Sequence, residues 1–475
     1  MLFNSFIFLI FLGVTVPLYL SLPRRFRNGF LLAASYFFYG YWDWRFLSLL
    51  LISTVVDFLV GRGLFRADNP RKRKRLLFLS LFVNLGLLAS FKYFNFFIDS
   101  FAKFGALFGT DLDFLHLNVI LPVGISFYTF QTLSYTIDIY RGKMTPTNNI
   151  LNFALYVAFF PQLVAGPIER AAHLLPQIEK SPTPVLQDFK EGMALITIGM
   201  FKKVMIGDTC GRMVDHIFAE PAYYASSELL GGLLLFAFQI YADFSGYSNI
   251  ARGTARLLGI NFMENFNQPY LASNIAEFWR RWHISLSSWL RDYLYIPLGG
   301  NQKGPRRTYI NLFLTMLLGG LWHGANWTFV FWGVLHGSCL AVHKFFLKTR
   351  KPVVRFVYNG PASLAIYTGK VAATFTFVLF AWLFFRSPSF STAFFILKKL
   401  VFWEPSEFTT RIASIVVAYG VVVLVMDLAE YISRDHTFML RLRPPIRWGI
   451  YLAVWAVTLL YMFQQKPMPF IYFQF

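Results

Sequence analysis

The chain has 475 residues, of which 56% are hydrophobic and 19% aromatic, and its mean hydropathy is +0.49. A soluble domain would have no interior for its 56 Phe side chains, so the composition excludes that class and predicts an all-α polytopic membrane protein. The formal net charge of +20 lies mostly in short loops between apolar runs, as positive-inside topology requires, and we expect no nucleic-acid binding. Cys210 and Cys339 lie far apart in apolar surroundings and indicate no disulfide framework.

The first half of the chain predicts a series of apolar spans. The N-terminus has no basic n-region and no small-residue cleavage site, so we interpret its first run as a span rather than a cleaved signal peptide. Basic residues follow that run and place the N-terminus outside. The predicted runs are 2–20, 29–41, 44–60, 76–98, 118–139 and 150–165. The second has about 13 residues, near 20 Å as a helix, so it crosses only part of a hydrocarbon core of about 30 Å.

Polar and proline-rich segments separate these runs. Arg71–Arg75 is the strongest basic run and is predicted to be a cytosolic anchor. Residues 101–117 and 171–190 are predicted to be loops. The two prolines and the glycine of Phe160–Arg170 predict broken or re-entrant structure there.

The second half changes character at Asp243. Residues 243–304 are too polar to span, and within them 274–295 is predicted to form a helix at the membrane interface. The apolar runs of this half lie at 191–206, 228–242, 308–346, 363–385, 390–403, 411–431 and 448–463. The tail 466–475 is predicted to be outside. Since no long linker separates two domains, we predict one membrane-embedded domain over 1–475, with a catalytic core at about 240–346.

The nine residues Gly-Gly-Leu-Trp-His-Gly-Ala-Asn-Trp (319–327) interrupt an apolar run that is too long for one span of about 20 residues. Both flanks of the run are basic, so it is predicted to enter from the cytosol, turn and come back. The first arm, 308–318, has about 11 residues and a length near 16 Å, which places His323 inside the hydrocarbon core. An imidazole there needs a cavity or a partner and is a candidate functional group.

The other histidines give weaker signals. Four lie in loop-like polar surroundings and are assigned no role: His116, His173, His216 and His436. His336 and His343 are two helical turns apart and share a face. No cysteine or carboxylate accompanies them at ligand spacing, so we predict no metal site.

Catalysis would rest on a histidine, because the sequence has no nucleophile elbow, phosphate-binding glycine loop or dinucleotide fingerprint. An imidazole, with a pKa near neutrality, can take a proton from a bound hydroxyl as a general base. Asn326 could orient His323 or polarise a carbonyl, or it could cap the helix after the break. His283 ends the Trp-Arg-Arg-Trp-His run and could be functional or a histidine of the membrane interface.

Several motifs together resemble the membrane-bound O-acyltransferase (MBOAT) family, and within it the bacterial alginate O-acetyltransferase branch. They are Trp322-His323-Gly324, Glu277–His283, Trp289–Asn301, Asp243–Tyr247, Asn265–Tyr270 and the tail Phe470–Phe475. The resemblance covers nearly the whole chain and is strongest from about 240 to 340. It implies a ring of tilted transmembrane helices around a thin centre, with re-entrant and interfacial helices. The apolar runs predict about 11 transmembrane spans in this ring, with a range of about 9 to 13.

The resemblance also implies a reaction. The protein would lie in the bacterial inner membrane. Acetyl-CoA would be the donor and would enter from the cytosol, and no metal would be involved. His323 matches the catalytic position of the family and His283 its second histidine. Tyr472 matches a tyrosine proposed to carry the acyl group, and the alternative for it is an aromatic anchor at the interface.

The implied partners are membrane lipids and an extracytoplasmic protein resembling an SGNH hydrolase, which passes the acetyl group to a polysaccharide such as alginate or peptidoglycan. Basic residues on the predicted inner side could attract the phosphates of CoA, or they could only set topology. These residues are Arg280, Arg281, Lys303, Arg306 and Arg307. The alternatives are D-alanyl transfer, lipid acyl transfer, a scaffold for polysaccharide export and a glycolipid transporter. A transporter would show inverted repeats and paired midplane charges, which we do not find in the sequence.

Overall fold

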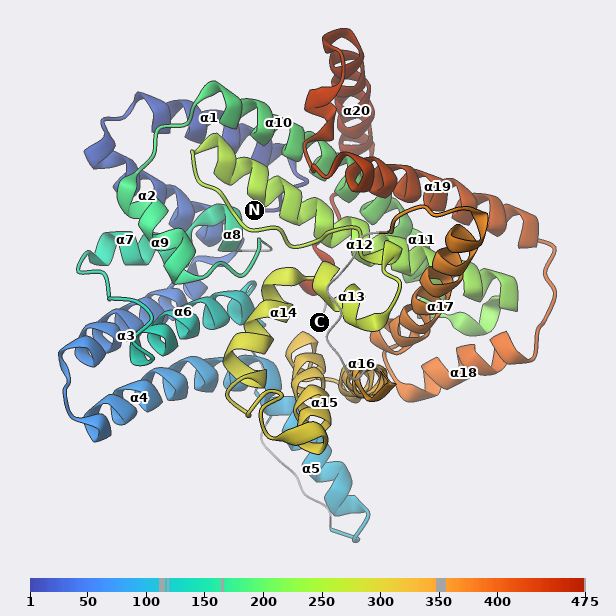
Figure 1. Ribbon diagram of the computed structural model, residues 1–475, viewed down its shortest axis with the longest axis horizontal. Helices are drawn as coiled ribbons and strands as arrows, with labels where there is room; N and C mark the ends of the chain where they lie inside the picture. The colour runs from blue at the N-terminus through green and yellow to red at the C-terminus, as the bar shows by residue number, and fades with distance from the viewer. Residues whose placement is uncertain (111–115, 118, 164–165, 347–355, 474–475) are drawn as a thin grey trace. The chain divides into compact units, whose positions relative to one another are not determined.

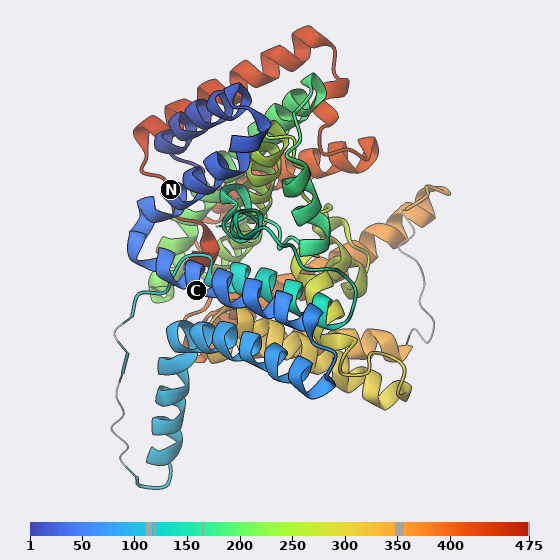
Figure 2. The same ribbon diagram turned by 90° about the vertical axis from the view of Figure 1, so that its left-hand side faces the viewer.

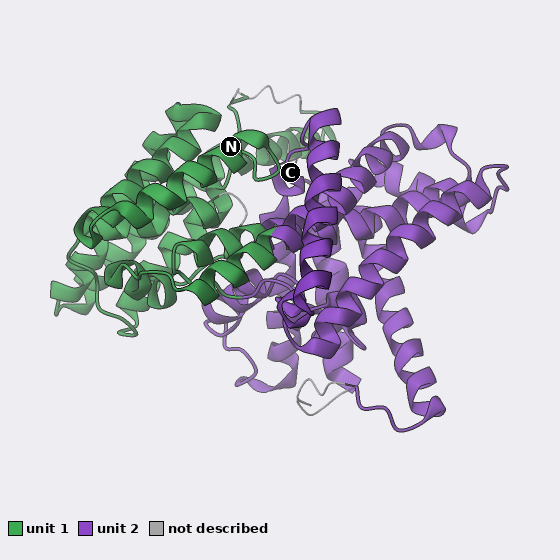
Figure 3. Cartoon of the chain, turned by 90° about the horizontal axis from the view of Figure 1, so that it is seen from above, with its two compact units in different colours: residues 1–196, 250–263 green, residues 197–249, 264–475 purple. Residues whose placement is uncertain are grey.

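The computed structural model describes residues 1–110, 116–117, 119–163, 166–346 and 356–473, and all regular secondary structure in these ranges is helical (Figure 1). The helices pack into two units, residues 1–196 with 250–263 and residues 197–249 with 264–475 (Figure 3). The division falls within α10 (Leu186–Met200) and α12 (Ser226–Leu257). The prediction of one domain over the whole chain stays a prediction.

The first unit contains the N-terminal helices. Its elements are α1 (Phe6–Ser21), α2 (Arg24–Asp43), η1 (Trp44–Phe46), α3 (Leu47–Arg66), α4 (Pro70–Leu88), η2 (Ala89–Tyr93), α5 (Phe94–Ala106), α6 (Ile125–Tyr140), α7 (Ile150–Ala158), α8 (Phe160–Leu163) and α9 (Ala171–Lys180). Short polar residues set where helices begin. Ser5 Oγ accepts from the N–H of Phe8 at 3.2 Å, and Asn69 caps α4 just before Pro70.

A buried polar cluster joins α3, α4 and α6. Asp57 Oδ1 accepts from Ser80 Oγ at 2.6 Å, and Asp57 Oδ2 accepts from Asn84 Nδ2 at 2.9 Å. The hydroxyls of Ser80 and Thr136 lie 3.1 Å apart. These contacts satisfy a carboxylate that would be expensive to bury in a membrane without partners.

Two segments predicted as loops in this unit, 101–117 and 171–190, contain helix, so the predictions were wrong at 101–106, 171–180 and 186–190, while residues 111–115 lie outside the described residues. After the π-helical turn η2, the helix α5 turns away from α4 and continues to Ala106 (Figure 2). The stretch predicted as a proline-rich loop contains α9, a helix that includes Pro176 and buries Leu174 and Ile178. His173 therefore lies on a helix, where its Nδ1 is 2.7 Å from Glu169 Oε2.

The predicted break near residue 160 is present. α7 ends at Ala158 and the short α8 begins at Phe160, with Phe159 between them. Pro161 lies in the first turn of α8, where its missing N–H has no partner to lose. Residues 164–165 of the predicted re-entrant segment lie outside the described residues.

The second unit contains the predicted hairpin and the C-terminal helices. Its elements are η3 (Phe201–Asp208), α11 (Thr209–Ala219), η4 (Pro221–Tyr223), η5 (Pro269–Leu271), α13 (Ile275–Arg281), α14 (Ile284–Leu290), η6 (Arg291–Tyr295), α15 (Gly304–His323), α16 (Trp327–Phe346), α17 (Pro361–Arg386), α18 (Phe390–Val401), α19 (Thr409–Ser433), η7 (Phe438–Arg441), α20 (Pro444–Gln464) and η8 (Ile471–Phe473). His216 lies within α11 rather than in a predicted loop.

Two predictions for residues 243–304 were wrong. The helix α12 continues past Asp243 to Leu257 because its polar side chains, Ser248 among them, are buried against partners rather than facing lipid. The single helix predicted at 274–295 is divided into α13, α14 and η6. His283 divides α13 from α14, because its φ of 42° is a left-handed conformation that an α-helix does not continue through.

Seven helical stretches of the described residues are long and apolar enough to cross a membrane. They are Arg24–Arg66, Pro70–Ala106, Ser226–Leu257, Trp327–Phe346, Pro361–Arg386, Thr409–Ser433 and Pro444–Gln464. Two shorter apolar helical stretches, Phe6–Ser21 and Ile150–Leu163, accompany them. The chain is thus a polytopic helical membrane protein, while the larger number of spans stays a prediction.

Candidate active site

The second unit has the hairpin that the basic flanks predict. α15 ends at His323, and α16 begins four residues later at Trp327. The two arms touch backbone to backbone. A Cβ atom added at Gly320 would lie 2.3 Å from the carbonyl oxygen of Phe329, and one at Gly333 would lie 2.4 Å from that of Met316. Since only glycine fits at such distances, the close packing of the arms fixes where His323 lies.

His323 is buried among aromatic rings that come from four elements. Its ring centroid is 5.0 Å from that of Trp332 on α16 and 5.1 Å from that of Trp322 on α15. Phe385 on α17 lies 5.3 Å away, and Tyr472 in η8 lies 5.4 Å away. The C-terminal tail therefore brings a hydroxyl-bearing ring directly to the predicted catalytic histidine.

The second histidine is held by an amide. Asn265 Oδ1 lies 3.1 Å from His283 Nδ1 and accepts from the N–H of Ser285 at 3.2 Å and from its hydroxyl at 2.9 Å. Because a backbone N–H can only donate, the Asn265 atom at this point is the oxygen, and His283 Nδ1 carries the hydrogen. Burial lowers the pKa of His283 to about 3, so the imidazole is neutral and Nε2 holds its lone pair.

Tyr472 lies within ring distance of both histidines. Its centroid is 6.4 Å from that of His283, and Phe244 packs on the two residues at 4.6 Å from His283 and 4.8 Å from Tyr472. Burial, and to a smaller extent the charge of Asp243, raises the pKa of the Tyr472 hydroxyl. A hydroxyl in this environment keeps its proton until a base removes it.

Asn326 has the geometry of the capping alternative. Its Oδ1 accepts from the N–H of Thr328 at 3.0 Å, and its Nδ2 donates to the carbonyl of Pro388 at 2.9 Å. The two contacts join the start of α16 to the end of α17. The structure gives no geometric support for Asn326 as an orienting or oxyanion group for His323.

His336 and His343 lie in different surroundings, although both are on α16. His336 is fully buried, its Nδ1 accepts from Trp279 Nε1 at 3.2 Å, and its ring lies 4.6 Å from that of Trp332. His343 lines a pocket. Among the described residues no group of three or more His, Cys, Asp or Glu side chains could hold a metal ion.

That pocket has a volume of about 730 Å³ and lies beside the hairpin. It is lined by Ala276, Trp279, Arg280, Ile284, Ser287, Ser288, Leu290, Arg291, Tyr295, Asn301, Thr308, Leu312, Thr315, Met316, Leu340, His343 and Lys344. The exposed lining includes cationic Arg280 and Arg291, whereas Trp279 and Met316 are buried. Met316 precedes His323 by seven residues on α15, so the buried end lies about 10 Å along the helix from the histidine.

Of the residues predicted to attract phosphates, the pocket includes Arg280. Arg281 is buried, pairs with Glu277, donates to the carbonyl of Gln268 and does not line the pocket, so the structure gives no geometric support for it as a donor-binding group. Arg306, Arg307 and Lys303 lie at the exposed start of α15 and do not line the pocket.

Other cationic lining residues were missed. They are Arg291 and Lys344. Arg291 was assigned only to the polar side of an interfacial helix, and Lys344 was interpreted only as a basic flank of the hairpin. The basic flank of the hairpin could have indicated that these residues line the pocket, because the end of α16 returns to the side where α15 begins.

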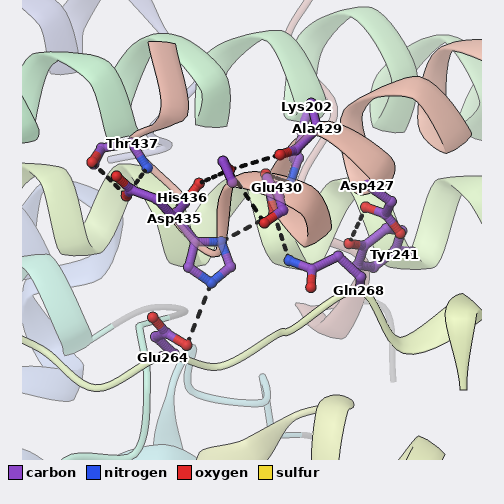
Figure 4. A network of polar contacts seen from close by, with 11 residues as sticks. Lys202, Tyr241, Glu264, Gln268, Asp427, Ala429, Glu430, Asp435, His436 and Thr437 are labelled. Carbon is purple, nitrogen blue, oxygen red and sulfur yellow. Dashed lines mark hydrogen bonds and ion pairs between the residues drawn. The ribbon is translucent and has the colours of Figure 1, made fainter. Parts of the chain in front are cut away.

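A second buried polar network supports the segment that carries Asn265 (Figure 4). Glu430 of α19 lies 2.8 Å from Lys202 Nζ and accepts from Gln268 Nε2 at 3.1 Å. His436 lies between Glu430 and Glu264, with its nitrogens 3.0 Å and 3.4 Å from their carboxylates. His436, to which the sequence assigned no role, thus helps hold residues 264–268 in place. An acidic residue within the apolar run 411–431 was the available signal.

Comparisons with known proteins show the family to which the chain belongs. The model of the MBOAT, membrane-bound O-acyltransferase family, matches residues 145–359. A probable alginate O-acetylase of Pseudomonas putida is 40% identical over 100% of both chains. A peptidoglycan O-acetyltransferase of Helicobacter pylori is 36% identical over 84% of this chain and 80% of its own. A teichoic acid D-alanyltransferase of Bacillus subtilis is 28% identical over 58% of this chain and 70% of its own. The chain therefore belongs to the membrane-bound O-acyltransferase family and is an O-acyltransferase.

Proposed function

We propose that the protein takes an acetyl group from cytosolic acetyl-CoA and delivers it across the bacterial inner membrane for O-acetylation of an extracytoplasmic polysaccharide. The observation that carries the proposal is that the ring of the buried His323 lies 5.4 Å from that of Tyr472, centroid to centroid, on a hairpin whose arms also line a pocket with cationic side chains. The relatives named for alginate and peptidoglycan acetylation support acetyl transfer and a glycan acceptor. The D-alanyl alternative has a relative with lower identity over less of the chain.

The pocket suits the donor. Arg280, Arg291 and Lys344 offer positive charge for the phosphates of CoA, although Arg291 also pairs with Asp292 at 2.7 Å. Ser287 and Thr315 also line the pocket, and their hydroxyl oxygens, whose hydrogens bond to the carbonyls of Trp282 and Asn311, can accept from the amide N–H groups of the pantetheine arm. The buried apolar end suits the acetyl thioester, which has no charge to solvate.

The chemistry is a proton transfer coupled to acyl transfer. His323 takes the proton of the Tyr472 hydroxyl, and the phenol oxygen attacks the carbonyl carbon of the thioester. The new C–O bond forms as the C–S bond breaks, and the departing thiolate takes the proton from His323. A tyrosyl ester and free CoA thiol result. The ester then transfers its acetyl group to a serine of a partner resembling an SGNH hydrolase, which acetylates the sugar hydroxyl.

Sidedness follows from charge. The basic flanks of the α15–α16 hairpin and the run 71–75 belong to the cytosolic side, and both chain termini to the outer side. The donor pocket, with its cationic lining, opens inward. The tail carries Tyr472 from the outer side to the site.

Replacement of His323 by Ala tests the proposal in cells that depend on this chain for polysaccharide acetylation. We expect surface O-acetyl to fall roughly a hundredfold or more, because general-base catalysis is worth about that much. Protein level and membrane insertion should be normal. The matched control is His116→Ala, which removes a surface histidine whose Nε2 contacts Asp99. Near-normal acetylation by the His323→Ala protein would refute the proposal.

A further inference from the structure

We propose that Lys203 and Asp243 form a clamp that binds the chain's own C-terminal tail through its backbone and so positions Tyr472 beside His323. The inference deepens the proposed function and rests on it, because in the proposed function Tyr472 accepts the acyl group. It also gives a role to the segment Asp243–Tyr247, whose side chains have no part in the chemistry above.

The clamp contacts the tail at two backbone groups just before the tyrosine. Asp243 Oδ2 accepts from the N–H of Ile471 at 2.8 Å, and Lys203 Nζ lies 3.4 Å from the carbonyl oxygen of Pro469, to which it donates. Hydrogen bonds to charged groups are shorter and stronger than those between neutral ones. Bonding to the backbone fixes the register of the tail whatever its side chains are, so it decides which residue faces His323.

The pair is built into the packing of the unit. Lys203 Nζ lies 2.6 Å from Asp208 Oδ1 and 2.6 Å from Asp243 Oδ1, and all three side chains are buried. Lys203 and Asp208 belong to the π-helix η3, and such helices often occur at functional sites. A Cβ at Gly246 would lie 2.8 Å from the backbone nitrogen of Lys203, so α12 and η3 pack too closely there for any larger residue.

An aromatic contact adds side-chain specificity. Phe470 is fully buried, and its ring lies 4.7 Å from that of Tyr247 and 5.2 Å from that of Phe244. The N–H of Phe473 donates to the carbonyl of Phe470 at 2.9 Å and closes the short turn η8. Proteins commonly bind an extended peptide in this way: hydrogen bonds to its backbone give affinity, and a pocket for a side chain gives specificity.

The rest of the tail does not position Tyr472 by itself. Residues 465–470, between the end of α20 and η8, have no regular helix or strand. Six such residues can reach about 20 Å in any direction that packing allows. A bond from Arg212 Nη2 to the carbonyl of Lys466 at 2.6 Å holds the start of this stretch, and the bonds at Pro469 and Ile471 fix the backbone next to Tyr472, whose ring lies 5.4 Å from that of His323. In this role Lys203 and Asp243 are positioning residues.

The sharpest test removes one hydrogen from the tail. Ile471→Pro deletes the N–H that Asp243 accepts and leaves the buried ion pair unchanged. Position 471 is the first residue of η8, where a helix tolerates proline. Ile471→Val is the matched control and keeps the N–H. Asp243→Asn removes the charge from the other side of the same bond. The readouts are hydrogen exchange at the amides of Tyr472 and Phe473 and acyl transfer by the full-length protein.

We expect exchange at these amides to rise, and transfer to fall, roughly tenfold or more in Ile471→Pro and Asp243→Asn, since a charged hydrogen bond is worth about that factor. Ile471→Val should match the parent protein. A tail that stays equally protected in both variants would overturn the clamp, and a released tail with unchanged transfer would overturn its positioning role. Tyr472→Phe separates the two proposals: full transfer with a protected tail would reject the acyl-tyrosine step and leave tail binding standing.

Discussion

Neighbouring arginines at 280 and 281 show how one position on a short helix changes the function of a side chain. Arg280 is exposed and lines the pocket, whereas Arg281 is buried against Glu277 and the carbonyl of Gln268. Adjacent helical residues point about 100° apart, so the two cannot share an environment. The sequence did contain the distinguishing signal, because Glu277 and Arg281 have the i, i+4 spacing of a helical ion pair.

Substituting each arginine by Ala separates donor binding from stability. Arg280→Ala should raise the KM for acetyl-CoA several-fold with little change in kcat, because it removes a charge that acts on the bound donor. Arg281→Ala leaves Glu277 buried without its partner, which costs about 3–5 kcal/mol, so the thermal midpoint should fall. Steady-state kinetics and thermal unfolding of the detergent-solubilised protein measure both. An unchanged KM in Arg280→Ala would contradict the assignment of the pocket to the donor.

The position of His323 inside the membrane was predictable from the local sequence. A role for Tyr472 was predictable only from the resemblance to the family. Basic flanks and the length of the first arm place His323 inside the membrane without any structure. The ring contact with Tyr472 depends on bonds between the tail and Asp243, more than 220 positions earlier, and no local pattern reports such a pairing. Asn265 was likewise hidden, since its partner His283 is 18 positions away.

The α15–α16 hairpin is the element that the sequence predicted best, and α12 one that it predicted poorly. Hairpin arms are set by local apolar runs, glycines and flanking charge, all of which are visible in sequence. α12 carries Asp243 and Ser248 on a helix that looks too polar to span. Their hydrogen-bond partners come from other segments of the chain. These partners compensate for burying polar side chains that, judged from the local sequence alone, make a membrane helix look unfavourable.

Close packing of the hairpin makes a prediction at this scale. Gly320→Ala would place a methyl group 2.3 Å from the carbonyl oxygen of Phe329, so the arms must separate, and overpacking of this kind costs about 1–3 kcal/mol. Gly449→Ala, in α20, meets nothing within 4 Å and should leave stability equal or slightly higher, since Ala favours helix. Thermal unfolding of the two purified variants compares them, and equal midpoints would contradict the backbone-to-backbone contact.

At the scale of the whole molecule, the proposed function requires the chain to bring a donor from one side of a membrane to an acceptor on the other. Composition was enough to predict a polytopic helical protein, because 56% hydrophobic residues cannot be buried otherwise. Seven long apolar helical stretches agree with that prediction. The two sides meet in our account at one buried point, where the hairpin supplies His323 and the tail supplies Tyr472.

The central claim is that His323 drives acyl transfer to Tyr472, and a single-turnover experiment with the purified full-length protein tests it most directly. The protein is mixed with acetyl-CoA labelled in the acetyl group and digested, and the C-terminal peptide is analysed by mass spectrometry. We predict label on Tyr472 in the parent protein, and none in His323→Ala or Tyr472→Phe. Label reaching the C-terminal peptide of His323→Ala at the parent rate would contradict the account.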